Sequence, residues 1–162
     1  MALAFLLVAI AIGVGVSTTF DTTDRTLVVE TEDGETIVSE PVDEESDIRI
    51  EYTHSVEKTP VIQHYTIEET TLVLSHSEFR SYGAGLPSTA SVERTDEGAF
   101  VRQIDEPRER IVLRPGETAG HTLVVDDEEF DLVSLSEGST VEIELTERTV
   151  IDMVRERGTN GD

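Results

Sequence analysis

The chain has 162 residues, which is enough for one domain with a modest core. Its 35 acidic residues against 12 basic ones give a formal net charge of -23, so no nucleic-acid partner is expected, because phosphate binding requires clustered lysine and arginine. The absence of cysteine excludes disulfides, thiol catalysis, cysteine-ligated metals and a lipid-modified cysteine.

The acidic composition is typical of a haloarchaeal surface. Molar salt shortens the Debye length to roughly 3 Å, which removes most of the repulsion that opposes a compact state in dilute buffer. Lys58 is the only lysine among the basic residues. The acidic residues alternate with valine, isoleucine and leucine instead of forming blocks, which argues against disorder or a cation-buffering tail. The composition therefore indicates a folded domain adapted to brine.

Residues 1–16 carry no charge, and a polar stretch follows them. The apolar run is slightly short for a membrane span, longer than most signal-peptide apolar regions, and preceded by no basic residue. This segment has three interpretations: an uncleaved anchor, a signal peptide cut after Ser17, or a buried core helix. We predict an apolar helix in an anchor or signal segment, residues 1–18, and a polar linker, residues 19–25. Either places the domain outside the cell membrane, and cleavage would make the protein secreted.

Residues 26–158 are predicted to form one all-β extracytoplasmic domain, an antiparallel sandwich or barrel, followed by a disordered tail over residues 159–162. Apolar residues recur with period two, and short turns separate the runs. The C-terminal stretch Arg148–Arg157 is either a short helix or a last strand. The expected strands are Thr26–Glu30, Glu35–Ser39, Ile48–Ser55, Val61–Ile67, Thr71–Phe79, Phe100–Ile104, Arg110–Arg114, His121–Val125, Phe130–Leu135 and Val141–Leu145.

The two hairpins between residues 48 and 79 allow a register prediction. A loop at residues 57–60 sets Tyr52 opposite Tyr65 and His54 opposite Gln63, so that every pair agrees in face. The next turn sets Gln63 beside His76. We therefore expect a polar row of His54, Gln63 and His76 across three strands. The loops at residues 57–60 and 81–87 are expected at the same end of the sheet.

The histidines are the candidates for metal binding or acid–base chemistry. His54 and His76, two strands apart, are expected to lie roughly 10 Å from each other. Glu57 or Glu78 would complete a metal site only by folding inward, so hydrogen-bonded histidines, no metal and no cofactor are expected. Ser55 lies next to His54 without the G-x-S-x-G pattern of a nucleophile elbow. A metal-dependent or serine/histidine hydrolase using His54 and His76 is the alternative function.

Lys58 is expected in a hairpin loop opposite the glycine loop at residues 83–85, whose backbone N–H groups would form an anion-binding nest. The two together predict a mouth for a small carboxylate. The alternative is a tight loop that needs glycine dihedral angles and carries a solvated lysine. No catalytic residue is predicted. The candidate ligand-binding residues are His54, Ser55, Glu57, Lys58, Gln63, His76, Ser81, Gly83 and Gly85.

Two motifs carry a family resemblance, the sequence YTHSVEKTPV at residues 52–61 and the sequence FRSYGAGLP at residues 79–87. The chain resembles the uncharacterised prokaryotic domain of unknown function numbered eighteen-fifty, over roughly Asp47–Leu145. In that family a carboxylate commonly follows the Pro-Val pair, whereas this chain has Ile62-Gln63-His64 there. This difference weakens any prediction of metal binding or acid–base chemistry at that position.

The resemblance implies a setting, because members are small exported or anchored proteins often encoded beside solute transporters of the TRAP type, in particular its TAXI subclass. It implies an extracytoplasmic accessory or binding domain and no enzyme, and it transfers no catalytic residues. A transporter permease or its solute-binding protein is the expected partner, in addition to the membrane bound through residues 1–16.

Overall fold

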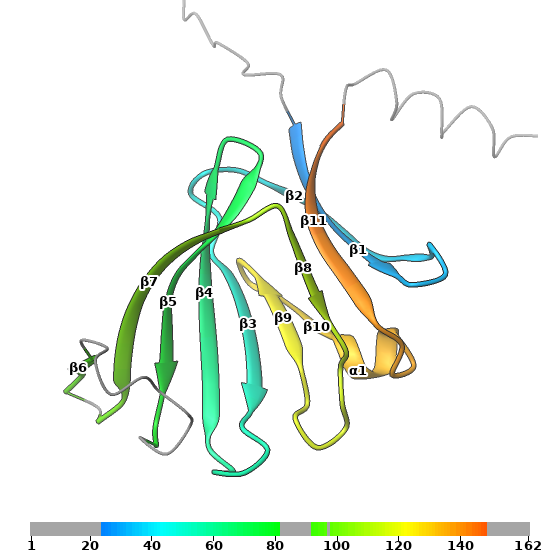
Figure 1. Cartoon of the computed structure of the whole chain (residues 1–162). Helices are drawn as coiled ribbons and strands as arrows, with labels where there is room; N and C mark the ends of the chain where they lie inside the picture. Colours follow the sequence, from blue (N-terminus) through cyan, green and yellow to red (C-terminus); the bar gives the residue numbers. More distant parts are fainter. Residues whose placement is uncertain (1–23, 82–91, 97, 149–162) are drawn as a thin grey trace, which may run out of the picture.

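The computed structural model of the protein describes residues 24–81, 92–96 and 98–148. Two antiparallel sheets face each other in this part of the chain (Figure 1). The smaller has the order β2-β1-β11-β8, with the strands β1 (Asp24–Thr31), β2 (Thr36–Val42), β8 (Arg110–Leu113) and β11 (Val141–Arg148). The larger has the order β10-β9-β3-β4-β5-β7-β6, with the strands β3 (Ile48–Thr53), β4 (Pro60–Glu68), β5 (Thr71–Phe79), β6 (Val92–Arg94), β7 (Phe100–Arg108), β9 (Thr122–Val125) and β10 (Glu128–Asp131).

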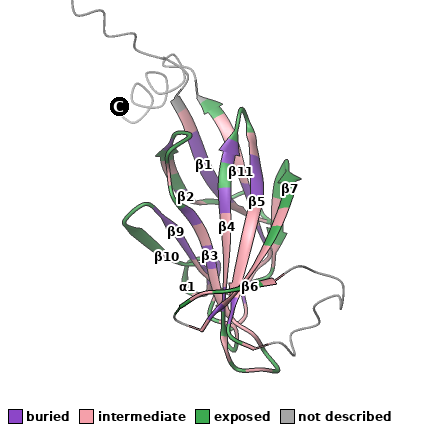
Figure 2. Cartoon of the chain, turned by 90° about the vertical axis from the view of Figure 1, so that its left-hand side faces the viewer, coloured by how far each residue is buried: buried purple, intermediate pink, exposed green. Residues whose placement is uncertain are grey.

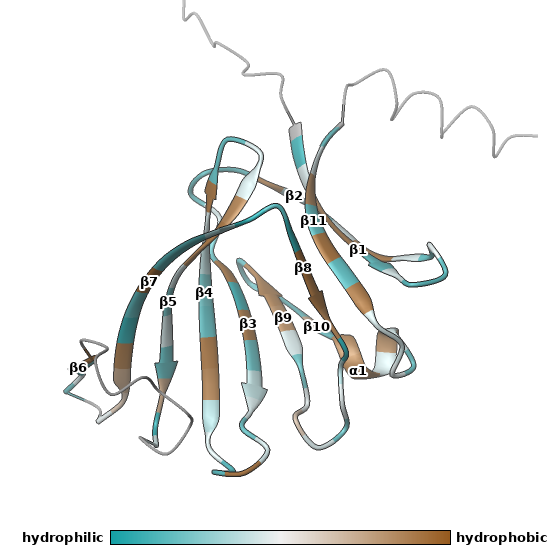
Figure 3. Cartoon of the chain, in the orientation of Figure 1, coloured by the Kyte–Doolittle hydropathy of each residue, from teal (hydrophilic) through white to brown (hydrophobic). Residues whose placement is uncertain are grey.

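The core lies between the two sheets. Hydropathy alternates along strands such as β4 and β11 (Figure 3), and the side of each strand that carries apolar side chains is the buried one. Buried residues run along β1 and β4, whereas β7 and β10 carry exposed residues (Figure 2). This alternation is what one buried face per sheet requires. The core cluster includes Leu27, Val29, Ile48, Ile50, Tyr65, Ile67, Leu72, Leu74, Leu123, Val125, Leu132, Val141 and Ile143.

The prediction of an all-β, antiparallel sandwich is confirmed, and the predicted strand Thr71–Phe79 has the bounds of β5. The predicted strand Phe130–Leu135 is wrong in its second half, because β10 ends at Asp131 and the short helix α1 (Leu132–Leu135) follows. The Asp131 carboxylate accepts hydrogen bonds from the backbone N–H groups of Val133 and Ser134, which caps the helix. Strand β6 was not predicted.

Several predicted segments lie outside the described residues. They are the apolar helix in residues 1–18, the linker up to residue 23, the element after residue 148 and the tail at residues 159–162. Within the described ranges, no helix has the length and hydropathy of a membrane span.

The predicted register of β3 and β4 is wrong. Tyr52 lies opposite Val61, and Ile50 opposite Gln63, instead of Tyr52 opposite Tyr65. The loop is longer than expected, since the His54 N–H donates to the Thr59 carbonyl at 2.9 Å and the Lys58 N–H donates to the His54 carbonyl at 2.9 Å. The error moves each partner by an even number of residues, so the predicted faces remain correct while the predicted neighbours change.

The register of β4 and β5 is right at the turn and wrong beyond it. Ile67 lies opposite Leu72 and Tyr65 opposite Leu74, as predicted. A β-bulge then follows, in which Ser75 is the extra residue, and His64 instead of Gln63 lies opposite His76. One extra residue reverses the two faces of the rest of the strand. The predicted polar row of His54, Gln63 and His76 is therefore not formed.

Candidate functional site

A cleft lies on the face of the larger sheet that points toward the smaller sheet, and it is the candidate binding site; residues of β8 in the smaller sheet line its first cavity only. It consists of two adjoining cavities of about 420 and 320 Å³, which share Tyr52, Gln63, Leu74 and Arg108 in their walls. Cavities of this size are typical of small-molecule sites. We call it the inter-sheet cleft. The first cavity is also lined by Ile50, Tyr65, Arg110, Ile111, Val112, Leu113 and His121, and the second by His54, Val61, Ser77, Phe79, Arg102, Ile104 and Glu106.

Arginine side chains give the inter-sheet cleft a positive wall. Arg102 of β7 is half-buried and makes no ion pair with any described residue. Arg108, at the end of the same strand, pairs with Glu106, which is the one acid in the described part of the cleft lining. Arg110 pairs with Glu142 of β11 at 2.6 Å. Arg102 is therefore the cation of this wall that is available for an anionic ligand.

Neutral hydrogen-bonding groups lie beside the arginines. The Tyr65 hydroxyl donates to Gln63 Oε1 at 3.1 Å, and the Gln63 amide nitrogen makes no hydrogen bond with a described residue. Across the cleft the Tyr52 ring stacks on the His121 ring with centroids 5.2 Å apart. The Gly116 N–H donates to His121 Nδ1 at 3.4 Å, which leaves Nε2 as the protonated nitrogen of the neutral ring. The cleft thus offers N–H donors besides its cations.

Burial keeps these groups uncharged. Desolvation raises the pKa of Tyr65 to about 12 from its ordinary value of 10.0, and the nearby Arg108 only partly opposes this rise. Burial also raises the pKa of Tyr52 and lowers the pKa of His121. At neutral pH both phenols and the His121 imidazole are therefore neutral, and the arginines and Glu106 carry formal charge in the cleft.

The Tyr65 hydroxyl gives an expected alkaline sensitivity. Between pH 10.0 and about 12 the unfolded chain loses this proton while the folded chain keeps it, so the free energy of unfolding falls as the pH rises. The loss is expected to be on the order of 2 kcal/mol. Tyr65→Phe should remove this part of the decline, measured by urea unfolding at pH 9 to 12. An equal decline in Tyr65→Phe and in the parent would contradict the assignment.

Of the nine residues predicted for the site, His54 and Gln63 line the inter-sheet cleft. Ser55 and Lys58 are exposed in the β3–β4 loop. Lys58 has a φ of 54°, the left-handed region, in which a residue with a side chain is uncommon. Gly83 and Gly85 lie outside the described residues, as does the nest that they were predicted to form.

Glu57 and Ser81 join the two loops that were predicted to share one end of the sheet. The Ser81 hydroxyl donates to Glu57 Oε2 at 2.6 Å, although the residues are 24 positions apart. The His54 ring also helps to fix this loop, because its Nδ1 accepts the Glu57 N–H at 3.2 Å. The β3–β4 loop and the chain after β5 therefore lie at the same end of the sheet, as predicted, as far as Ser81. The hydrogen bonds of Glu57 to Ser81 and to His54 hold the β3–β4 loop beside the cleft.

His76, the remaining predicted residue, does not lie in the cleft. The bulge at Ser75 places Ser77 and Phe79 in the cleft wall and turns His76 and Glu78 to the other face of the sheet, beside His64. His54 and His76 are thus on opposite faces, so these two histidines cannot act on one substrate as the alternative hydrolase requires. His64 was missed as a candidate because the predicted register set Gln63 beside His76.

Sequence reasoning also missed the arginines of the cleft. The residues of β7 that face inward are Phe100, Arg102, Ile104, Glu106 and Arg108, at every second position. The sequence contained a signal for these cations, because two arginines occupy the apolar side of this strand. Such a charge needs a partner or a ligand, because an unpaired charge is costly to bury.

The family described as a domain of unknown function (DUF1850) matches residues 48–132, which are 85 of the 162 residues. This match confirms the resemblance that the two motifs carry. It extends from the first residue of β3 to the first residue of α1, so it includes the complete lining of the inter-sheet cleft. No curated protein and no solved structure matches the chain.

Proposed function

The chain belongs to the DUF1850 family, a domain of unknown function, and from this premise we propose that it is a membrane-tethered extracytoplasmic binding domain that serves a TRAP/TAXI-type solute transporter. The ligand is a small carboxylate, and its site is the inter-sheet cleft. The observation that carries the ligand class is Arg102, a half-buried guanidinium in the cleft wall that pairs with no described carboxylate.

The overall charge supports an anion as the ligand. The chain has a net charge of -23, so an arginine on its surface has many carboxylates within reach. Among the described residues, the second cavity nevertheless brings Arg102 and Arg108 together with one acid, Glu106. A guanidinium binds a carboxylate through two parallel hydrogen bonds, which makes it a specific partner for that group. The acidic exterior would repel anions elsewhere on the domain.

The remaining lining supports a small organic acid with an apolar part. Val61, Leu74, Phe79 and Ile104 face the second cavity beside the polar groups, and its volume of about 320 Å³ suits a molecule of a few carbon atoms or a single ring. The amide nitrogen of Gln63 is available as a further donor. The apolar side chains would bind the body of the ligand while the arginines bind its carboxylate.

The role is binding and not catalysis. His54 Nδ1 accepts the Glu57 N–H, and His121 Nδ1 accepts the Gly116 N–H while its ring stacks on Tyr52. Among the described residues, neither histidine of the cleft forms a hydrogen-bonded pair with a nucleophile. The transporter setting and the outward orientation come from the family resemblance and from the apolar residues 1–16. We combine the transporter setting and the outward orientation with the carboxylate ligand in one proposal, because a solute transporter needs a domain that recognises its solute.

The ligand class is tested with the full chain in mild detergent and molar potassium chloride. Calorimetric titration with acetate, succinate, 2-oxoglutarate and benzoate is compared with titration by the corresponding amides. Binding of at least one acid, without binding of its amide, is the expected result. Equal heats for acids and amides, or no heat from any of them, would contradict a carboxylate site.

The transporter role is tested separately by purification of the tagged full chain from its own membranes in high salt. A transporter permease or its solute-binding protein is expected to co-purify. Recovery of the chain without either partner, under conditions in which the permease itself remains intact, would contradict this part of the proposal.

A further inference from the structure

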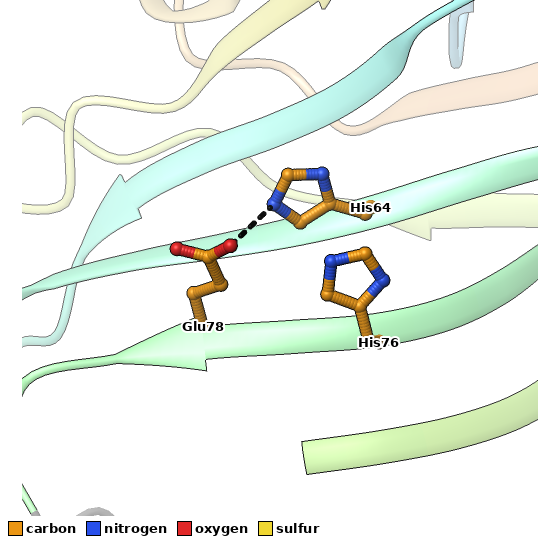
Figure 4. Close-up of side chains that lie close together, drawn as sticks. All are labelled: His64, His76 and Glu78. Atoms are coloured by element: carbon orange, nitrogen blue, oxygen red, sulfur yellow. Dashed lines mark ion pairs between the residues drawn. The ribbon is translucent and has the colours of Figure 1, made fainter. Parts of the chain in front are cut away.

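Two histidines and one glutamate meet on the face of the larger sheet that points away from the inter-sheet cleft (Figure 4). The rings of His64 and His76 stack with centroids 4.1 Å apart and planes 8° apart. Glu78 Oε1 lies 3.5 Å from His64 Nε2. One ligand atom of each residue lies within 4.8 Å of the other two, and both rings present a nitrogen on the side of Glu78. This is a convergent set of donor atoms.

The hydrogen bonds of Ser75 fix the tautomer of the His76 ring. The Ser75 hydroxyl donates its one hydrogen to the His64 carbonyl at 3.0 Å, so towards His76 Nδ1, also at 3.0 Å, it acts as the acceptor. His76 Nδ1 therefore carries the proton, and Nε2 has a free lone pair. Metal-binding histidines are oriented in this way, with the second ring nitrogen donating to a fixed oxygen.

The other ring has a buried nitrogen without a hydrogen bond. His64 Nε2 is inaccessible to solvent and has no hydrogen-bond partner in the described part of the chain. A buried polar atom that lacks a partner costs about 1–3 kcal/mol. Coordination of a metal ion would satisfy it.

The surroundings carry a net negative charge. On the neighbouring strand β3, Arg49 lies opposite His64 and pairs with both Asp47 and Glu51. Arg80, which lines a small cavity together with Glu78, adds a second guanidinium. With Asp47, Glu51 and Glu78, three carboxylates thus face two guanidiniums, and the opposing residue of β7 is the neutral Gln103. A cation is therefore attracted to this face and not repelled by it.

We propose that His64, His76 and Glu78 bind one divalent transition-metal ion, with zinc as the ion that the donor set suits best. Two imidazoles and one carboxylate are the ligands of zinc sites that keep the fourth position open. Tetrahedral coordination brings donor atoms to roughly 3.3 Å from each other, given metal–nitrogen bonds of about 2.0–2.1 Å. All three side chains are only partly buried. Binding requires the two rings to turn out of their parallel stack, so that the lone pairs of both ring nitrogens point at the ion. The site is independent of the inter-sheet cleft.

The test is zinc titration of the full chain in mild detergent by calorimetry, with cobalt(II) absorption as a report on tetrahedral geometry. The parent is expected to bind one ion. His76→Gln and Glu78→Gln should each weaken binding at least about tenfold. Glu68→Gln, which removes an exposed carboxylate from the same face of β4, should bind as the parent does. No zinc binding by the parent, or unchanged binding by His76→Gln in a folded protein, would overturn the site.

Ser75 is assigned as a positioning residue, and its variants extend the test. Ser75→Ala should weaken zinc binding about tenfold and make it more dependent on pH, because the His76 tautomer is no longer fixed. Ser75→Thr, which keeps the hydroxyl, should restore both. A purely structural effect would lower the melting temperature in Ser75→Ala without changing the pH dependence of zinc binding, and that result would overturn the assignment.

Discussion

Replacing Arg102 and Arg108 together by glutamine is expected to weaken binding of the carboxylate ligand by at least about a hundredfold. A hydrogen bond to a charged group contributes about 1.5–3 kcal/mol, and 1.4 kcal/mol corresponds to a factor of ten in affinity. Arg102→Gln alone should have the larger single effect, because Arg108 is 47% exposed and already pairs with Glu106. Calorimetric titration of the full chain with the tightest-binding acid measures the loss.

The control is Arg114→Gln, which removes the same charge from an exposed residue outside the cleft lining. It should bind the acid as tightly as the parent does. Thermal unfolding of each variant shows whether the fold is retained. Unchanged affinity in the folded double variant would exclude the arginines as the ligand-binding groups, and an equal loss in Arg114→Gln would show that only the total charge matters.

Leu27→Ala is expected to lower the free energy of unfolding by about 2–5 kcal/mol. Leu27 is 0% exposed and lies on β1, which pairs with β2 on one side and with β11 on the other. The substitution leaves a cavity at the centre of the smaller sheet, where neighbours held by two ladders cannot collapse into it. Domains of this kind have a total stability of only about 5–15 kcal/mol, so a large part of it is lost.

Urea unfolding in molar salt measures this loss. Leu135→Ala is the matched control, because Leu135 undergoes the same chemical change while 43% exposed at the end of α1. It should cost well under half as much. Equal losses in the two variants would contradict the placement of the core between the sheets.

The sequence was sufficient to predict the fold class because the acidic residues alternate with apolar ones at period two. It was insufficient for the register, which depends on the backbone hydrogen bonds of the loop from His54 to Thr59. A loop of six residues and a loop of four preserve the same alternation of faces, so hydropathy alone does not distinguish them. Helix α1 was missed for a similar reason, since its cap is a single carboxylate on Asp131.

The candidate site was predicted only at its margin. His54 and Gln63 were identified as polar residues near one sheet end, and both line the inter-sheet cleft. The cations of the cleft were missed, because β7 was followed only to Ile104 and the inward positions of Arg102 and Arg108 were not considered. The apolar side of β5 changes from Leu72 and Leu74 to Phe79, a change between even and odd positions that indicates a bulge.

The bulge at Ser75 has a consequence for the evolution of β5. A chain without this residue would pair Leu74 with Tyr65 and His76 with His64 in an unbroken ladder with β4, and every later side chain would keep its present face. The pairing of β5 with β4 therefore gains nothing from the additional residue. What a deletion would remove is the hydroxyl between the His64 carbonyl and the His76 ring. Retention of a serine there in related chains, in preference to other residues at the bulge, would accordingly indicate selection on the histidines and not on the pairing with β4.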